Sequence, residues 1–298
     1  LSPSRLRMFG QSTDSFIFYH LFSPKKGKKL RQFQYEFHTT KSREFFITLI
    51  SYMKEKHLEK DIDTCSFLCG FICHYVLDSI VHPYVFYKTG NFNKKDPATY
   101  KYNNLHLYME TYLDNYLIYD REKRNPYSFP VSQFCFDMQP FSMGLKKAIR
   151  YTFLQTYQIS DMDIKYWQSL KDMKFSLRVF RQDCYGIKRC IYQLVDKITP
   201  KSCFLFGPVS YHCPMKNHYS FLNFKHHLWR NPTTYSITSR ESFYDLYAKS
   251  LKIARKMIED VFSYFEGNKI LLEKIFTNLS YITGLDCDLN KELRYFEF

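Results

Sequence analysis

Three polar side chains recur at every fourth position within an apolar segment. His74, Asp78 and His82 lie in FICHYVLDSIVHPYVF, residues 71–86. In an α-helix, four residues advance about 400°, so these side chains share one narrow face. Zinc binds imidazole nitrogens and carboxylate oxygens, and a pair four residues apart on a helix can chelate one ion. The spacing predicts a helix that presents ligands to two metal ions in a row.

The same spacing appears again further along the chain, in HLYMETYLDNYL, where His106 and Glu110 are four residues apart. Two more residues of the required types come earlier: Asp14 in QSTDSFIFY and His38 in YEFHTT. Taken alone, Asp14 is more simply a helix cap or turn residue, and His38 an ordinary loop histidine. On the main segment, however, a buried carboxylate beside two imidazoles requires a metal or a mutual hydrogen-bond network, since unpaired burial is costly.

The helices that must position these residues follow from apolar periodicity along the chain. We expect an all-α fold, a single multi-helix domain over residues 1–298 with long irregular loops. The expected helices cover residues 41–57, 62–82, 104–119, 143–158, 161–196 and 239–265. The irregular stretches are residues 120–142 and 198–238, which contain proline and lack periodicity.

Local signals refine this picture at two places. Thr238 and Glu241 have the spacing of a capping box, which predicts the start of the last helix. A basic run contains Pro24 and Gly27 and therefore predicts a solvated loop; its charged residues are Lys25, Lys26, Lys28, Lys29 and Arg31. Such a run could also guide an anionic substrate or lie on an anionic membrane surface.

The composition narrows the class of partner and the compartment. A formal net charge of +14, from 43 Lys and Arg against 29 Asp and Glu, favours phosphate esters, acidic lipid surfaces or nucleic acid. The nine cysteines form no Cys-x-x-Cys pair, and Cys65, Cys69 and Cys73 share a helical stripe typical of small core residues. No stretch has the roughly 20 uninterrupted apolar residues of a membrane span, and the first residues lack the apolar core of a signal peptide. We therefore expect a cytoplasmic protein.

Together these motifs resemble the zinc-dependent phospholipase C family. The family pattern is an early Asp, a His, a His-x-x-x-Asp with a further His, and a His-x-x-x-Glu. Here it is matched by Asp14, His38, His74-x-x-x-Asp78, His82 and His106-x-x-x-Glu110. The stretches HTTKSREFF and WRNPTTYSITSRESFYDLY also look like members of the family without secretion signals, so the resemblance spans residues 10–265.

The resemblance implies two metal sites and a hydrolytic activity. One zinc would be held by Asp14, His38, His74 and Asp78, and a second by His82, His106 and Glu110. The family's third zinc takes the amino terminus and an early His, and no His precedes His20 here, so two or three ions are implied. Metal-activated water would hydrolyse a phospholipid or another phosphodiester, with Asp14 as the candidate catalytic base.

Two other functions fit the same residues. Single-strand-specific zinc nucleases share the helical fold and ligand pattern, and a net charge of +14 suits polynucleotides. Alternatively, the zinc ions only brace the helices, because structural zinc can contribute folding energy without catalysis. The choline pocket of the family uses an aromatic residue directly after the early Asp, where this chain has Ser15.

Overall fold

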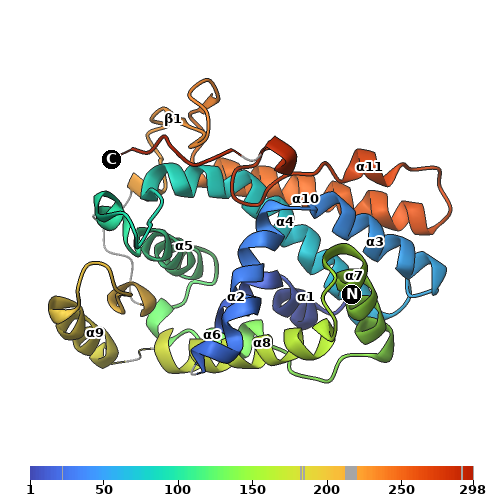
Figure 1. Cartoon of the computed structure of the whole chain (residues 1–298), viewed down its shortest axis with the longest axis horizontal. Coiled ribbons are helices and arrows are strands. Elements are labelled where there is room, and N and C mark those ends of the chain that lie inside the picture. Colours follow the sequence, from blue (N-terminus) through green and yellow to red (C-terminus); the bar gives the residue numbers. More distant parts are fainter. Residues whose placement is uncertain (22, 182, 184, 212–219, 290, 298) are drawn as a thin grey trace. The chain divides into compact units, whose positions relative to one another are not determined.

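The computed structural model describes residues 1–21, 23–181, 183, 185–211, 220–289 and 291–297 (Figure 1). The chain is 65% helical. The strands in the described part are two residues each, β1 Trp229–Arg230 and β2 Thr238–Ser239, paired antiparallel with Trp229 opposite Ser239. The predicted all-α class is confirmed. The chain divides into two compact units, each assembled from three separate segments.

Unit 1 consists of Leu1–Ile80, Ser132–Phe175 and Ala248–Asn290. Its elements are α1 Pro3–Phe9, the 3-10 helix η1 Ser12–Phe18, α2 Pro24–Thr39, α3 Ser42–Glu55, most of α4 Ile62–Thr89, most of α6 Val131–Cys135, α7 Met143–Tyr157, most of α8 Met162–Ser176, the latter part of α10 Phe243–Phe265, α11 Leu272–Ile275 and the 3-10 helix η7 Cys287–Leu289. Three buried rings join α2, α3 and α7: Phe45 lies 5.0 Å from Phe37 and 5.2 Å from Phe153 between centroids, both edge to face. This aromatic core lies beside the helices that carry the first group of predicted ligands.

Unit 2 consists of Val81–Val131, Ser176–Tyr247 and Lys291–Phe298. Its elements are the end of α4, the 3-10 helix η2 Pro97–Tyr102, α5 Leu105–Arg121, the 3-10 helix η3 Pro126–Ser128, the π-helix η4 Leu177–Arg181, α9 Ile187–Ile198, the 3-10 helix η5 Gly207–Val209, β1, β2 and the start of α10. The end of α4 is anchored by Tyr84, whose ring packs on Trp229 and whose hydroxyl donates to the Phe221 carbonyl at 3.0 Å.

Helix α4 carries the row of His and Asp residues at four-residue spacing. It begins after Asp61, whose carboxylate accepts from the backbone N–H of Thr64 at 2.8 Å as an N-cap. It continues past Pro83 to Thr89, seven residues beyond the predicted end. By length and composition this helix could cross a membrane, but 83% of its most apolar window is buried inside the protein. That burial is what a core helix requires.

The single helix predicted over residues 161–196 is wrong. Helix α8 ends at Ser176, a π-helical turn follows, and α9 starts only at Ile187. Gly186, directly before α9, has φ of +70°, a left-handed conformation that glycine adopts without steric cost. The apolar residues of the two helices therefore belong to two separate faces.

Two other local predictions are also corrected. The basic run predicted as a loop lies in α2, because Pro24 suits the first helical position and the segment up to Thr39 buries Leu30, Phe33 and Phe37. The capping box of α10 is formed by Ser242 and Asp245, whose side chains bond to each other's backbone N–H, whereas Thr238 lies in β2. Part of the irregular stretch 198–238, residues 212–219, lies outside the described residues.

Candidate metal centre

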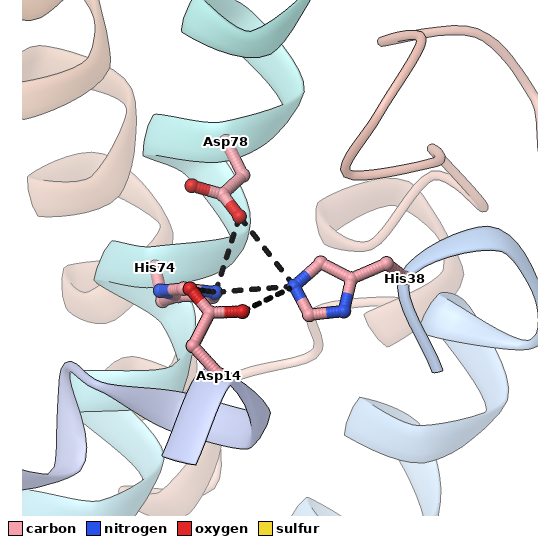
Figure 2. Close-up of side chains that lie close together, drawn as sticks. All are labelled: Asp14, His38, His74 and Asp78. Carbon is pink, nitrogen blue, oxygen red and sulfur yellow. Dashed lines mark hydrogen bonds and ion pairs between the residues drawn. The ribbon is translucent and has the colours of Figure 1, made fainter. Parts of the chain in front are cut away.

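Four predicted ligands meet within unit 1. Asp14 comes from η1, His38 from the last turn of α2, and His74 and Asp78 from one face of α4 (Figure 2). The Nε2 atom of His38 lies 3.4 Å from Nε2 of His74, 3.3 Å from Asp14 Oδ1 and 3.6 Å from Asp78 Oδ2. The Nε2 atom of His74 lies 3.1 Å from Asp78 Oδ2 and 3.7 Å from Asp14 Oδ2. Figure 2 shows the four side chains converging on one point.

The two imidazoles present the same nitrogen to this point because the other nitrogen is already occupied. Nδ1 of His38 lies 2.7 Å from the Gln34 carbonyl oxygen, and Nδ1 of His74 lies 3.1 Å from the Gly10 carbonyl oxygen. A carbonyl only accepts, so both Nδ1 atoms carry the proton and donate. In the neutral imidazoles, both Nε2 lone pairs and two carboxylates therefore face one another. Only a shared cation, whether a metal ion or a proton, makes that arrangement favourable.

Further contacts hold Asp14 and His38 in place. Gln34 donates from Nε2 to Asp14 Oδ1 at 2.9 Å. The His38 carbonyl accepts from the Tyr281 backbone N–H at 2.9 Å, and the Tyr281 ring packs against the His38 ring with centroids 4.8 Å apart. Asp14 is the accessible member, with 37% of its side chain exposed against 2% for His38.

The electrostatics of the group follow from mixing two carboxylates with two imidazoles. Burial favours neutral His38, but hydrogen bonds and charge from Asp14 and Asp78 outweigh it and raise the His38 pKa to about 10. The His74 pKa is also raised, since Asp78 and Asp14 oppose the effect of burial. Burial would raise the Asp14 pKa, but His74 and His38 lower it on balance. The cluster therefore stabilises positive charge at its centre.

The spacing of the ligand atoms fits zinc. Tetrahedral bonds of about 2.0–2.1 Å place ligand atoms about 3.3 Å apart. The separations that involve the two imidazoles, 3.1–3.7 Å, surround that value, and the four ligand atoms all lie within 4.8 Å of one another. The donor set of two imidazole nitrogens and two carboxylate oxygens is one that zinc accepts, and each imidazole has the backbone partner that fixes zinc-binding histidines.

A second group of predicted ligands meets within unit 2. Nε2 of His106 lies 3.0 Å from Oε1 of Glu110 one turn later on α5, and Nε2 of His82 on α4 lies 3.4 Å from the same oxygen. Burial opposes ionisation of Glu110, but His106 and His82 outweigh it and lower the Glu110 pKa. Three such ligands leave one position of a tetrahedral zinc site for water or substrate.

Three residues beside this second group were missed by the sequence reasoning. Asp114 continues the row of His106 and Glu110 by one more turn of α5, and its Oδ2 accepts from the Tyr211 hydroxyl at 2.8 Å. Nη1 of Arg181 donates to that same hydroxyl oxygen at 2.9 Å and to Asp114 Oδ2 at 3.3 Å. The four-residue spacing could have flagged Asp114, but no local signal links residues 114, 181 and 211.

A cavity in unit 2 is distinct from this group. It has a volume of ≈ 460 Å³, and its lining residues are Lys88, Thr89, Lys101, Tyr102, Leu105, Tyr108, Ser220 and Phe221. None of the proposed ligands lines it, although Leu105 and Tyr108 flank His106 in the chain. The ligand group is thus not the floor of that cavity.

Comparison with known proteins identifies the family. A family model described as zinc dependent phospholipase C matches residues 15–176, more than half of the chain. The chain belongs to the zinc-dependent phospholipase C family. The match contains every predicted ligand of both groups except Asp14, which directly precedes it. No curated protein and no solved structure gives a significant match.

The family match covers only part of this phospholipase C family member. The match covers residues 15–176, so it includes every proposed ligand except Asp14 and does not reach Arg181 or α9. The wider resemblance expected over residues 10–265 stays a prediction beyond the match. Separately, the described residues contain two groups of His, Asp and Glu whose ligand atoms lie within 4.8 Å of one another.

Proposed function

We propose that this protein is a zinc-dependent hydrolase of phosphodiesters that acts on phospholipids in the manner of a phospholipase C. One observation supports it above the others: Nε2 of His38 and Nε2 of His74 lie 3.4 Å apart while both Nδ1 atoms are committed to backbone carbonyls. Two lone pairs held this close, with two carboxylates around them, form a site for a cation. Membership of the family supports zinc as the metal and hydrolysis of a phosphodiester as the reaction.

The roles of the chain's own residues follow from their exposure and partners. Zinc bound in such sites polarises phosphoryl oxygens and supplies hydroxide near neutral pH. His38 and His74 are buried and fixed by backbone carbonyls, so they act as rigid ligands. Asp14 is the exposed ligand, and Gln34 holds one of its oxygens, so Asp14 is placed to orient the attacking water and accept its proton.

In unit 2, Arg181 would bind the anionic oxygens of the substrate. Its guanidinium is held by Asp114 and Tyr211, and the charge of Glu110 also stabilises it. Among the described residues both side-chain hydrogen bonds of Arg181 use Nη1, which leaves Nε and Nη2 for a phosphate. An arginine with two donors directed at a phosphate gives the bidentate pairing that this group favours.

The position that follows Asp14 does not contribute to a headgroup pocket. Ser15 is fully buried there, and its hydroxyl donates to the Ser12 carbonyl at 3.0 Å. A side chain turned into the core cannot form the aromatic wall of a choline pocket. We therefore propose a phospholipid phosphodiester as the substrate, without a choline pocket at this position.

The test is zinc content combined with turnover. Purified protein is analysed for zinc and assayed with a chromogenic phosphodiester, with phospholipid vesicles and with single-stranded DNA, each with and without a chelator. Two or more zinc ions per chain and chelator-sensitive release of diacylglycerol support the proposal. Preferential cleavage of DNA would make the protein a nuclease instead, and bound zinc without turnover of any substrate would make the zinc structural.

A further inference from the structure

Helix α9 presents its apolar side to solvent. At 100° per residue, Ile187, Ile191, Leu194 and Ile198 fall within a sector of about 60°. These side chains are exposed by 60%, 51%, 63% and 84% respectively, and no residue of α9 is buried. In a surface helix of a globular protein this stripe would face the core. In α9 the direction is reversed.

The opposite side of α9 faces the protein, where the Tyr192 ring packs on Phe206 with centroids 5.8 Å apart. The buried Asp183 carboxylate accepts from the backbone N–H groups of Lys188 and Arg189, at 3.2 and 2.8 Å. At the other end, Asp196 accepts from the backbone N–H groups of Phe206 and Gly207, at 2.8 and 2.7 Å. Both ends of the helix are thus tied down by charged hydrogen bonds. The four aliphatic side chains therefore point outward because the helix is held in this orientation, and not because its ends are frayed.

We propose that the apolar face of α9, defined by Ile187, Ile191, Leu194 and Ile198, inserts into the surface of an anionic phospholipid bilayer. This proposal rests on the proposed function, since the bilayer holds the phospholipid substrate. A helix with an exposed aliphatic stripe flanked by cations is the form that lies in the headgroup region of a membrane.

Charge around α9 favours an anionic surface. The segment from residue 185 to residue 201 contains four basic residues, Lys188, Arg189, Lys197 and Lys201, against the single acidic residue Asp196. Asp196 bonds to backbone N–H groups of the protein, and the Lys188 ammonium donates to the Val179 carbonyl, whereas Lys197 and Lys201 are exposed and carry the attraction. Each basic residue near an anionic leaflet adds about 1 kcal/mol of attraction.

The size of the face argues against a second copy of the chain as its partner. A helix of 12 residues is about 18 Å long and about 10 Å wide, so it covers about 200 Å². A stable protein interface buries about 800 Å² on each partner. The apolar face of α9 is too small for that alone, but four aliphatic side chains are sufficient for shallow insertion into lipid, particularly with Tyr185 and Phe204, exposed by 88% and 51%, close by in the chain.

The test compares two double variants of the zinc-loaded protein. Ile191→Ser with Leu194→Ser removes half of the apolar face, while Ile164→Ser with Leu271→Ser removes side chains of the same kind, exposed by 59% each, from α8 and from the residue before α11. Binding is measured by sedimentation with vesicles of about one part phosphatidylserine to two parts phosphatidylcholine. Turnover is measured separately on a soluble chromogenic phosphodiester.

The expected result is vesicle binding weakened about tenfold or more in the α9 variant, with soluble turnover unchanged and the control variant binding as the parent does. Unchanged vesicle binding by the α9 variant would overturn the proposal. A parent dimer in analytical ultracentrifugation that the α9 variant loses would overturn it in favour of a contact between copies. Vesicle binding that depends on α9 in a protein with no phosphodiesterase activity would support the proposal while refuting the proposed function.

Discussion

Nδ1 of His74 bonds to the Gly10 carbonyl because Gly70, one turn earlier on α4, has no side chain. A Cβ atom at Gly70 would lie 2.7 Å from the carbonyl carbon of Phe9 and 2.8 Å from the nitrogen of Gly10. These are backbone atoms, so they cannot rotate away as a side chain could. The close approach of α1 to α4 therefore sets the distance of 3.1 Å that fixes the His74 ring.

Replacing Gly70 with alanine is expected to weaken both folding and zinc binding. The methyl group forces α1 away from α4, which costs about 1–3 kcal/mol of unfolding free energy. It also removes the partner of His74 Nδ1, and loss of such a partner lowers metal affinity about 10–100-fold. Urea denaturation and zinc titration against a competing chelator measure the two effects.

Gly144→Ala is the matched control for this prediction. At Gly144 the nearest atom to an added Cβ is Cδ2 of Leu58 at 2.8 Å, the end of a flexible side chain. The substitution also raises helix propensity at the start of α7. Its effect on zinc affinity should be absent. If Gly70→Ala and Gly144→Ala behave alike, the contact between Gly10 and His74 does not control the site.

Asp78→Asn is expected to remove zinc and activity together. The carboxylate faces both His38 and His74, so the amide withdraws the negative charge that balances the ion at the centre of the four ligands. Zinc per chain should fall after dialysis, and turnover of a phosphodiester should fall with it. Glu259→Gln on the exposed face of α10 serves as the charge-matched control. Full zinc content with full turnover in Asp78→Asn would refute the assignment of Asp78.

The second group should be separable from the first. His106→Ala removes the ligand nearest to Glu110 Oε1, at 3.0 Å, and leaves the four ligands of unit 1 untouched. We expect the protein to lose one zinc ion and keep the other, since the two groups use different residues. Mass spectrometry under native conditions counts the ions directly. A variant that keeps its full zinc content would show that His106 and Glu110 form only a hydrogen bond.

The ligand row on α4 could be predicted from sequence because it is a local property. His74, Asp78 and His82 face one way on any helix, so recognising the helix was sufficient. The helical class was predictable for the same reason. The surroundings of the other ligands were harder to predict. His38 was expected in a loop, yet it lies in the last turn of α2. The basic composition of this segment and Gly27 had indicated a loop instead of a helix.

Contacts between distant segments left no such signal. The group of Asp114, Arg181 and Tyr211 joins residues 67 and 97 positions apart, and only the folded chain brings them together. The break between α8 and α9 was missed because the apolar periodicity continues through it, although Gly186 stands at the point where α9 begins. A helix whose apolar face points outward cannot be recognised from periodicity, which does not say what the face contacts.

The pH dependence of folding should reveal the proton that zinc replaces. In the metal-free protein the His38 pKa is raised from 6.5 to about 10 by Asp14 and Asp78, which outweigh burial. A raised pKa stabilises the fold fully below pH 6.5, and the contribution is lost as pH rises through about 10. Urea denaturation after chelator treatment should thus show a falling unfolding free energy over this window.

The comparison with His38→Gln isolates this contribution. The variant should lack most of the decline between pH 6.5 and about 10, while His57→Gln, at an exposed position, should retain it. Saturating zinc should also flatten the curve, because the ion then occupies the Nε2 lone pair. An identical decline in parent and His38→Gln would mean that His38 does not hold the proton.

Arg5 is expected to be the most sensitive basic residue for the stability of unit 1. It is 5% exposed, and its Nε and Nη2 bond to the Asp63 carboxylate at 2.8 and 2.6 Å. Its other N–H groups bond to three backbone carbonyls, those of Asp137, Gln139 and Pro140. All five donors of the guanidinium are therefore used, an arrangement that the three donors of lysine cannot reproduce.

Arg5→Lys should accordingly lower the unfolding free energy by about 2–5 kcal/mol, since three donors replace five and at least two of the buried acceptors lose their partner. Arg7→Lys is the control, because Arg7 donates from Nε to the Phe134 carbonyl at an exposed position and should change stability by no more than about 0.5 kcal/mol. Urea denaturation measures both. A loss of less than about 1 kcal/mol for Arg5→Lys would show that water replaces the missing donors, and that water reaches the carbonyls around Arg5.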